Sequence, residues 1–271
     1  MPAISSRFNR YLWILAVTLA FTPGAYGQLP VLSQADKEWL GERIFQNECA
    51  GRFECLTSWN EGEDFPSLGI GHFIWYQAGQ IEPFEETFPE LLEFYRQRRQ
   101  ALPAWLSDSS TVASPWRSRD EFYLQIDSPP MQELRGFLAA SKAVQVEYIS
   151  ERLHRSVSGI TGQFTEAAQP KVADQLYQIA NSAPPLGLYA LIDYIHFKGT
   201  GLSTSERYQN QGWGLLQVME QLQNSHATLE NFVQAAELVL ERRVANAPSG
   251  RNEQRWLAGW KNRLRTYLPG A

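Results

Sequence analysis

The chain has 271 residues, of which 44% are hydrophobic, and its 24 basic and 29 acidic side chains give a net charge of −5. A chain of this length can bury a substantial core. The negative net charge, with no basic cluster in the sequence, argues against nucleic acid as a partner.

Residues 1–27 have the pattern of a cleaved signal peptide. Arg7 and Arg10 make the start positively charged, residues 12–21 form an apolar run too short to span a bilayer comfortably, and Ala25 and Gly27 place small residues at the cleavage site. We therefore expect an exported protein, periplasmic or secreted, with residues 28–271 as one domain and no stable membrane insertion. The alternative is an uncleaved N-terminal anchor.

The first predicted helix carries a carboxylate on its apolar face. Leu40, Ile44 and Glu48 follow one another at intervals of four, so they share one side of a helix. Gly51 is expected to end this helix. Partial desolvation and the negative end of the helix dipole would both raise the pKa of Glu48, and a protonated carboxyl can act as a general acid. Alternatively, Glu48 is an ordinary solvated or salt-bridged residue at a helix end.

A predicted β-hairpin follows this helix. Residues 56–60 (LTSWN) and 67–76 (SLGIGHFIWY) have the composition of strands, and the acidic, glycine-containing segment 60–64 between them has that of a turn. The order of a Glu at a helix end, an acidic turn, Ser67 and then G-I-G-H at residues 69–72 resembles the active-site segment of the phage-type lysozymes, in the lysozyme-like superfamily. The resemblance covers about thirty residues.

This resemblance implies roles for individual residues. Glu48 matches the family's general acid, Ser67 stands where the family usually has Thr, and His72 orients the site from behind the hairpin. Glu61 matches the second acidic residue. The interval between Glu48 and G-I-G-H is longer than in the phage enzymes, so the choice among Glu61, Glu63 and Asp64 for the second carboxylate stays open.

The two cysteines, Cys49 and Cys55, flank the predicted site. If the helix ends at Gly51, the following turn can bring them within disulfide distance, and export would permit oxidation. The alternative is a pair of buried free thiols.

Most of the remaining chain has helical periodicity, and one segment is irregular. Residues 185–197 are apolar on every side, which predicts a buried central helix. The last helix carries several arginines that are candidates to pair with site carboxylates. The predicted helices cover residues 83–100, 131–157 (one helix or a pair), 163–183, 185–197, 229–244 and 251–267, and residues 101–130 are predicted to be an irregular insertion.

Amide side chains and a tryptophan are grouped in residues 209–219. Amides hydrogen-bond sugar hydroxyl and acetamido groups, and an indole stacks on a pyranose face. The G-L-L-Q of residues 214–217 is similar to the G-L-M-Q of lytic transglycosylases. Alternatively, Trp213 belongs to the core and the amides cap a helix. The predicted substrate-binding residues are His72, Trp59, Tyr194, Trp213 and Gln217.

The histidines do not indicate a metal centre. His72, His154, His196 and His226 lack the H-E-x-x-H or any other ligand spacing, so we predict neither a metal nor a cofactor.

Together these features predict an α+β fold, mainly helical, with a small hairpin or sheet beside the site helix, as the lysozyme-like resemblance implies. The expected activity is exported cleavage of peptidoglycan or a related amino-sugar polymer by carboxylate acid catalysis, either by hydrolysis or by a lytic transglycosylase reaction. The negative net charge leaves two alternatives open. One is a non-catalytic envelope module that binds glycan or protein, and the other is a chitosanase-like hydrolase.

Overall fold

The computed structural model describes residues 29–81, 84–107 and 113–270, so the predicted signal peptide at residues 1–27 lies outside the described residues. Within these ranges the chain is mainly helical with one small antiparallel sheet, which confirms the α+β prediction. The helices are α1 (Gln34–Cys49), α2 (Phe88–Gln97), α3 (Ala104–Ser107), α4 (Arg119–Leu124), α5 (Pro129–Ala140), α6 (Lys142–Thr161), α7 (Gln169–Ala180), α8 (Leu186–Lys198), α9 (Leu215–Leu222), α10 (Leu229–Asn246) and α11 (Gln254–Arg265), with 3₁₀ turns η1 (Phe53–Leu56) and η2 (Ser249–Arg251). The strands are β1 (Thr57–Ser58), β2 (Ser67–Leu68) and β3 (Phe73–Ile74).

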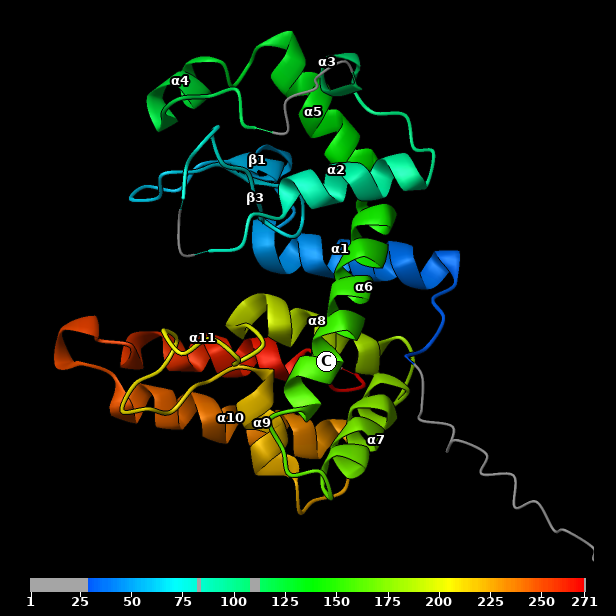
Figure 1. Ribbon diagram of the computed structural model, residues 1–271, viewed down its shortest axis with the longest axis vertical. Coiled ribbons are helices and arrows are strands. Elements are labelled where there is room, and N and C mark those ends of the chain that lie inside the picture. Colours follow the sequence, from blue (N-terminus) through cyan, green and yellow to red (C-terminus); the bar gives the residue numbers. More distant parts are fainter. Residues whose placement is uncertain (1–28, 82–83, 108–112, 271) are drawn as a thin grey trace, which may run out of the picture.

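The elements form two lobes (Figure 1). The sheet and α2–α5 make up one, here called the sheet lobe, and α7–α11 make up the other, the helical lobe. Helix α1 lies beside the sheet and packs on α6, which runs from the sheet lobe into the helical lobe. Buried apolar side chains from α1 through to the segment after α11 form one continuous hydrophobic cluster. The C-terminal end of α1 therefore lies where the two lobes meet.

Helix α1 is capped at both ends, and it ends just before Gly51, as the sequence predicts. Ser33 and Asp36 form a reciprocal capping box at the N-terminus, which satisfies backbone donors that would otherwise lack partners. At the other end, Ala50 adopts a left-handed conformation, with Gly51 following at a φ of +69°. Leu40 and Ile44 are fully buried, so the next residue on this face, Glu48, points along the same side into the junction between the lobes.

The three strands pair antiparallel in the order β1-β2-β3, with Thr57 opposite Leu68 and Leu68 opposite Phe73. The prediction of one strand over residues 67–76 is wrong, because G-I-G-H is the turn that joins β2 to β3. Gly69 has a φ of +69°, a conformation that favours glycine. The turn is held from α6, where the Gln145 side-chain oxygen accepts a hydrogen bond from the Ile70 amide at 2.9 Å.

The predicted helices are present, with some changes at their boundaries. Helix α8 is buried along almost its whole length, as its apolar sequence predicts. Residues 131–157 belong to two helices, α5 and α6, which meet at Ser141. The segment 101–130 is not wholly irregular, since it contains α3 and α4 and the start of α5. Across the described ranges, we find no helix with the length and apolar character needed to cross a bilayer.

Candidate functional site

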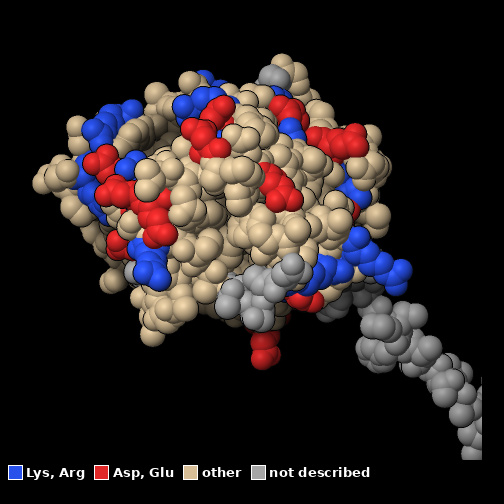
Figure 2. Space-filling model, turned by 90° about the horizontal axis from the view of Figure 1, so that it is seen from above, with Lys and Arg blue, Asp and Glu red and all other residues tan. Residues whose placement is uncertain are grey.

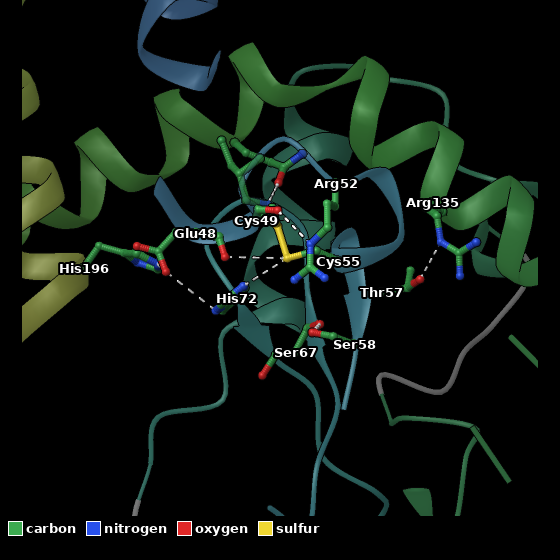
Figure 3. Close-up of a disulfide and its surroundings, with 12 residues drawn as sticks. Glu48, Cys49, Arg52, Cys55, Thr57, Ser58, Ser67, His72, Arg135 and His196 are labelled. Atoms are coloured by element: carbon green, nitrogen blue, oxygen red, sulfur yellow. Dashed lines mark hydrogen bonds and ion pairs between the residues drawn. A yellow bond between two sulfur atoms is a disulfide. The ribbon is translucent and has the colours of Figure 1, made fainter. Parts of the chain in front are cut away.

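Glu48 is the centre of a group of charged side chains at the junction of the lobes (Figure 3). Its side chain is 13% exposed and forms an ion pair with Arg263 of α11, which also donates a short hydrogen bond to it. Two imidazoles flank the same carboxylate: His72 Nδ1 and His196 Nε2 each lie 3.8 Å from Glu48 Oε2. The prediction that an arginine of the last helix pairs with a site carboxylate is confirmed.

Arg263 is held in turn by Asp193 of α8. Its Nε and one terminal nitrogen each lie 2.8 Å from an oxygen of Asp193, which is completely buried. Tyr267 donates a further hydrogen bond to Asp193 at 2.6 Å, and Asn47 donates one at 3.0 Å. This pairing satisfies a buried charge that would otherwise be very costly, and it fixes the guanidinium that faces Glu48.

The predicted direction of the Glu48 pKa shift is wrong. Burial does raise the pKa, but the attraction of His196 and Arg263 and the hydrogen bond from Arg263 outweigh burial, so the pKa lies below its ordinary value. Burial also lowers the pKa of His196, although the charge of Glu48 opposes this. Arg263 is therefore the cation that remains beside Glu48 at neutral pH, and Glu48 is ionised in the free protein.

Cys49 and Cys55 form a disulfide with a Cα–Cα distance of 5.4 Å, so the alternative of two free thiols is wrong. The bridge ties the last residue of α1 to η1, next to Glu48. Cys55 Sγ lies 3.8 Å from His72 Nε2, so the imidazole stands between the disulfide and the Glu48 carboxylate (Figure 3). Burial lowers the pKa of His72, against the opposing charge of Glu48.

A cavity of about 680 Å³ adjoins this group of charges. His196, whose imidazole faces Glu48, and Gly71, which precedes His72 in the chain, line one part of its wall. Trp213 and Tyr208 line another part, and their rings lie 4.7 Å apart. The cavity thus extends from His196, whose imidazole faces Glu48, to an aromatic wall of the helical lobe, although Glu48 itself does not line it. Its volume is typical of small-molecule sites.

The second carboxylate predicted from the hairpin is not at the centre of the site. Glu61 is exposed on the turn, and so is Asp64. Glu63 is half-buried, and its charge acts on the pKa of His72. Ser67 lies 4% exposed within β2, where its carbonyl accepts a hydrogen bond from Ser58. Of the acidic residues in the turn, Glu63 thus has the closest electrostatic link to the site.

Only some of the predicted substrate-binding residues face the cavity. Trp213 lines it, but this side chain is only 8% exposed and belongs to the hydrophobic core, as the alternative interpretation stated, and Arg243 lies over its ring. His72 contacts Glu48 and is not among the residues that line the cavity. The prediction is wrong for three others, because packing occupies their side chains. Tyr194 is fully buried and donates to the Trp213 carbonyl, and Trp59 is 2% exposed and donates to the Glu63 carbonyl. Gln217 accepts from the Gly214 amide and donates to the Gly201 carbonyl, so it caps α9, as the alternative interpretation stated.

The sequence did not single out Asp193, His196 or Asn47 as site residues. A carboxylate within an otherwise apolar helix was the one available signal for Asp193, because a buried charge needs a partner.

On the face shown in Figure 2, basic and acidic side chains are interspersed rather than gathered by sign.

Comparisons of the chain with protein-family models, with curated proteins and with solved structures gave no match. The lysozyme-like interpretation therefore rests on the residues of the α1–sheet segment and on the geometry around Glu48.

Proposed function

We propose that this protein cleaves glycosidic bonds of peptidoglycan or a related amino-sugar polymer, with Glu48 as the group that transfers the proton. The supporting observation is the position of Glu48: a carboxylate, 13% exposed, that faces His196, and His196 lines a cavity of about 680 Å³ with an aromatic wall. A sugar ring in contact with the Tyr208–Trp213 wall would lie in the same cavity that His196 lines.

The ionised state of Glu48 constrains this mechanism. A carboxylate paired with Arg263 has to take up a proton before it can donate one to a glycosidic oxygen. A saccharide that reaches past His196 to Glu48 would exclude water from the carboxylate, and desolvation would raise its pKa. The group then serves as acid when the bond breaks and as base in the second step. Because Glu61 is exposed, this one-carboxylate scheme, which corresponds to the lytic transglycosylase variant, fits the site better than a two-carboxylate scheme.

The charge of the cavity wall does not choose between polymers. Arg152, Arg243 and Arg251 line it, together with the acidic residues Glu85 and Glu206. Arg152 pairs with Glu85 and Arg243 pairs with Glu253, so most of this charge is already compensated. A chitosanase-like activity is therefore an outcome that the experiment below decides.

A non-catalytic glycan-binding module is the second candidate. The observation that favours it is the closed ion pair of Glu48 with Arg263, together with the exposure of Glu61. In that case the cavity and Trp213 would bind a saccharide without cleaving it.

The test is incubation of the purified protein with peptidoglycan and with chitosan, followed by mass analysis of the products. Glu48→Gln should lower turnover of peptidoglycan by at least ~10²-fold, the scale of general acid catalysis, while the fold is kept. Glu42→Gln is the matched control, because Glu42 is exposed on the same helix and pairs with Lys142. Products that lack the added water would indicate the transglycosylase reaction. Saccharide binding without any product would refute cleavage and support the binding module.

A further inference from the structure

We propose that the reduced form of this protein binds a zinc ion through Cys49, Cys55 and His72. The site does not depend on the proposed glycosidase function, because its ligands are two thiols and an imidazole, although His72 also contacts Glu48. One donor atom from each of the three residues lies within 4.8 Å of the others.

The distances match what a tetrahedral zinc ion requires. With Zn–S near 2.3 Å and Zn–N near 2.1 Å, a sulfur and a nitrogen ligand lie about 3.6 Å apart and two sulfurs about 3.8 Å apart. Cys55 Sγ and His72 Nε2 are already 3.8 Å apart. Once the disulfide is broken, the two sulfurs need only move apart by rotation of their side chains for the ion to enter between them.

The orientation of His72 supports the same site. Its Nε2 faces Cys55 Sγ, while its Nδ1 faces Glu48 Oε2 at 3.8 Å (Figure 3). Metal-binding histidines commonly direct the second ring nitrogen to a carboxylate, which fixes the tautomer and the ring plane. Here that carboxylate is already present.

The environment leaves a path for the ion. Cys49 is 1% exposed, whereas the side chain of His72 is 30% exposed, so access is from the imidazole side. Two thiolates and an imidazole form a donor set that zinc prefers, and three protein ligands leave a fourth position for water.

The site exists only after a redox step. A dithiol reductant supplies two electrons to the Cys49–Cys55 bond, which becomes two thiols, while the reductant itself becomes a disulfide. Zinc then displaces the two thiol protons.

The experiment uses the full chain and Co²⁺ as a spectroscopic probe for the zinc site. The protein is reduced anaerobically, the reductant is removed, and Co²⁺ is titrated while absorption is recorded. We expect one Co²⁺ per chain, with a thiolate-to-cobalt charge-transfer band and the visible bands of tetrahedral cobalt, and loss of both when Zn²⁺ is added. The oxidised protein should show neither band.

His72→Gln keeps both cysteines but removes one ligand of the metal. It should therefore weaken Co²⁺ binding by more than the roughly 10–100-fold that is typical when a residue hydrogen-bonded to a metal ligand is lost. The control is His154→Gln, since His154 is exposed on α6. Far-ultraviolet circular dichroism is recorded in parallel. If the reduced chain loses structure, recovery on adding Co²⁺ supports the site. Absence of the charge-transfer band, equal affinity of the two histidine variants, or equal binding by the oxidised protein would each overturn the proposal.

Discussion

Arg263→Met should strongly destabilise the protein, because this side chain compensates two carboxylates at once. Asp193 is completely buried and Arg263 is 16% exposed. Removing one partner of a buried ion pair typically costs about 3–5 kcal/mol, since the other charge is left without compensation. Tyr267 and Asn47 still donate to Asp193, so we expect a loss near the lower end, about 3 kcal/mol of the free energy of unfolding.

The measurement is urea unfolding at neutral pH. Arg265→Met is the matched control, because Arg265 is exposed on the same helix and its side chain bonds to Asn262. Adding Asp193→Asn to Arg263→Met should restore part of the loss, since the stranded charge is then removed. Equal stability of Arg263→Met and Arg265→Met would refute this account of the pair. So would a double variant whose loss of unfolding free energy equals the sum of the losses of Arg263→Met and Asp193→Asn.

The pH dependence of this loss gives a second check. The pKa values of Asp193 and Glu48 are both lowered in the folded protein, through Arg263 among other groups. Their contribution to stability is therefore present above the pKa values of the unfolded chain and is lost as the pH falls through the folded values. The difference between wild type and Arg263→Met should be largest near neutral pH and should shrink in acid. A difference that grows in acid would contradict this sign.

Four further predictions concern the site and its surroundings. If Glu48 donates the proton, the turnover of peptidoglycan should rise as the pH falls from neutral. In Arg263→Met the pH profile of the residual activity should shift toward higher pH, because Arg263 lowers the pKa of Glu48. A rate independent of pH would count against this. Glu63→Gln should lower turnover more than Glu61→Gln or Asp64→Asn, and equal small losses would mean that the turn supplies only a diffuse negative field. Reduction of the Cys49–Cys55 bridge should leave the circular dichroism spectrum nearly unchanged yet impair activity by loosening Glu48, because so short a loop restricts the unfolded chain little; a melted fold on reduction would show a global role instead. Burial and the nearby Arg243 and Arg263 lower the pKa of Lys198 to about 6, so Lys198→Met should be more stable than wild type at neutral pH. The difference in unfolding free energy should narrow as the pH rises toward the ordinary pKa of lysine. Urea unfolding across this range is the measurement, and a difference that widens would contradict the prediction.

Local sequence patterns predicted what depends on local contacts. The spacing of Leu40, Ile44 and Glu48 identified the face of α1, and Gly51 marked its end, because helix periodicity and left-handed capping are decided within a few residues. The apolar run of α8 predicted its burial for the same reason. The division of residues 67–76 into two strands was missed, since the turn between them is held by Gln145, which is 75 residues away from Ile70.

The electrostatics of the site could not be predicted locally. Desolvation and the helix dipole predicted a raised pKa for Glu48, but Arg263 and His196, which come from other helices, reverse the shift. The same limit applies to Tyr194 and Gln217, because a polar side chain near a site has the same sequence signature whether it faces a ligand or satisfies a buried backbone group.

The contact between Glu48 and Arg263 joins residues that are 215 positions apart in the chain. The sheet and the Cys49–Cys55 bridge join residues that are near one another in the sequence, so both can form while Glu48 still lacks its cation. Contacts of high sequence separation form late, because loop closure has to precede them. In refolding, the acquisition of a working Glu48 should therefore lag behind the helical signal and follow the docking of α11.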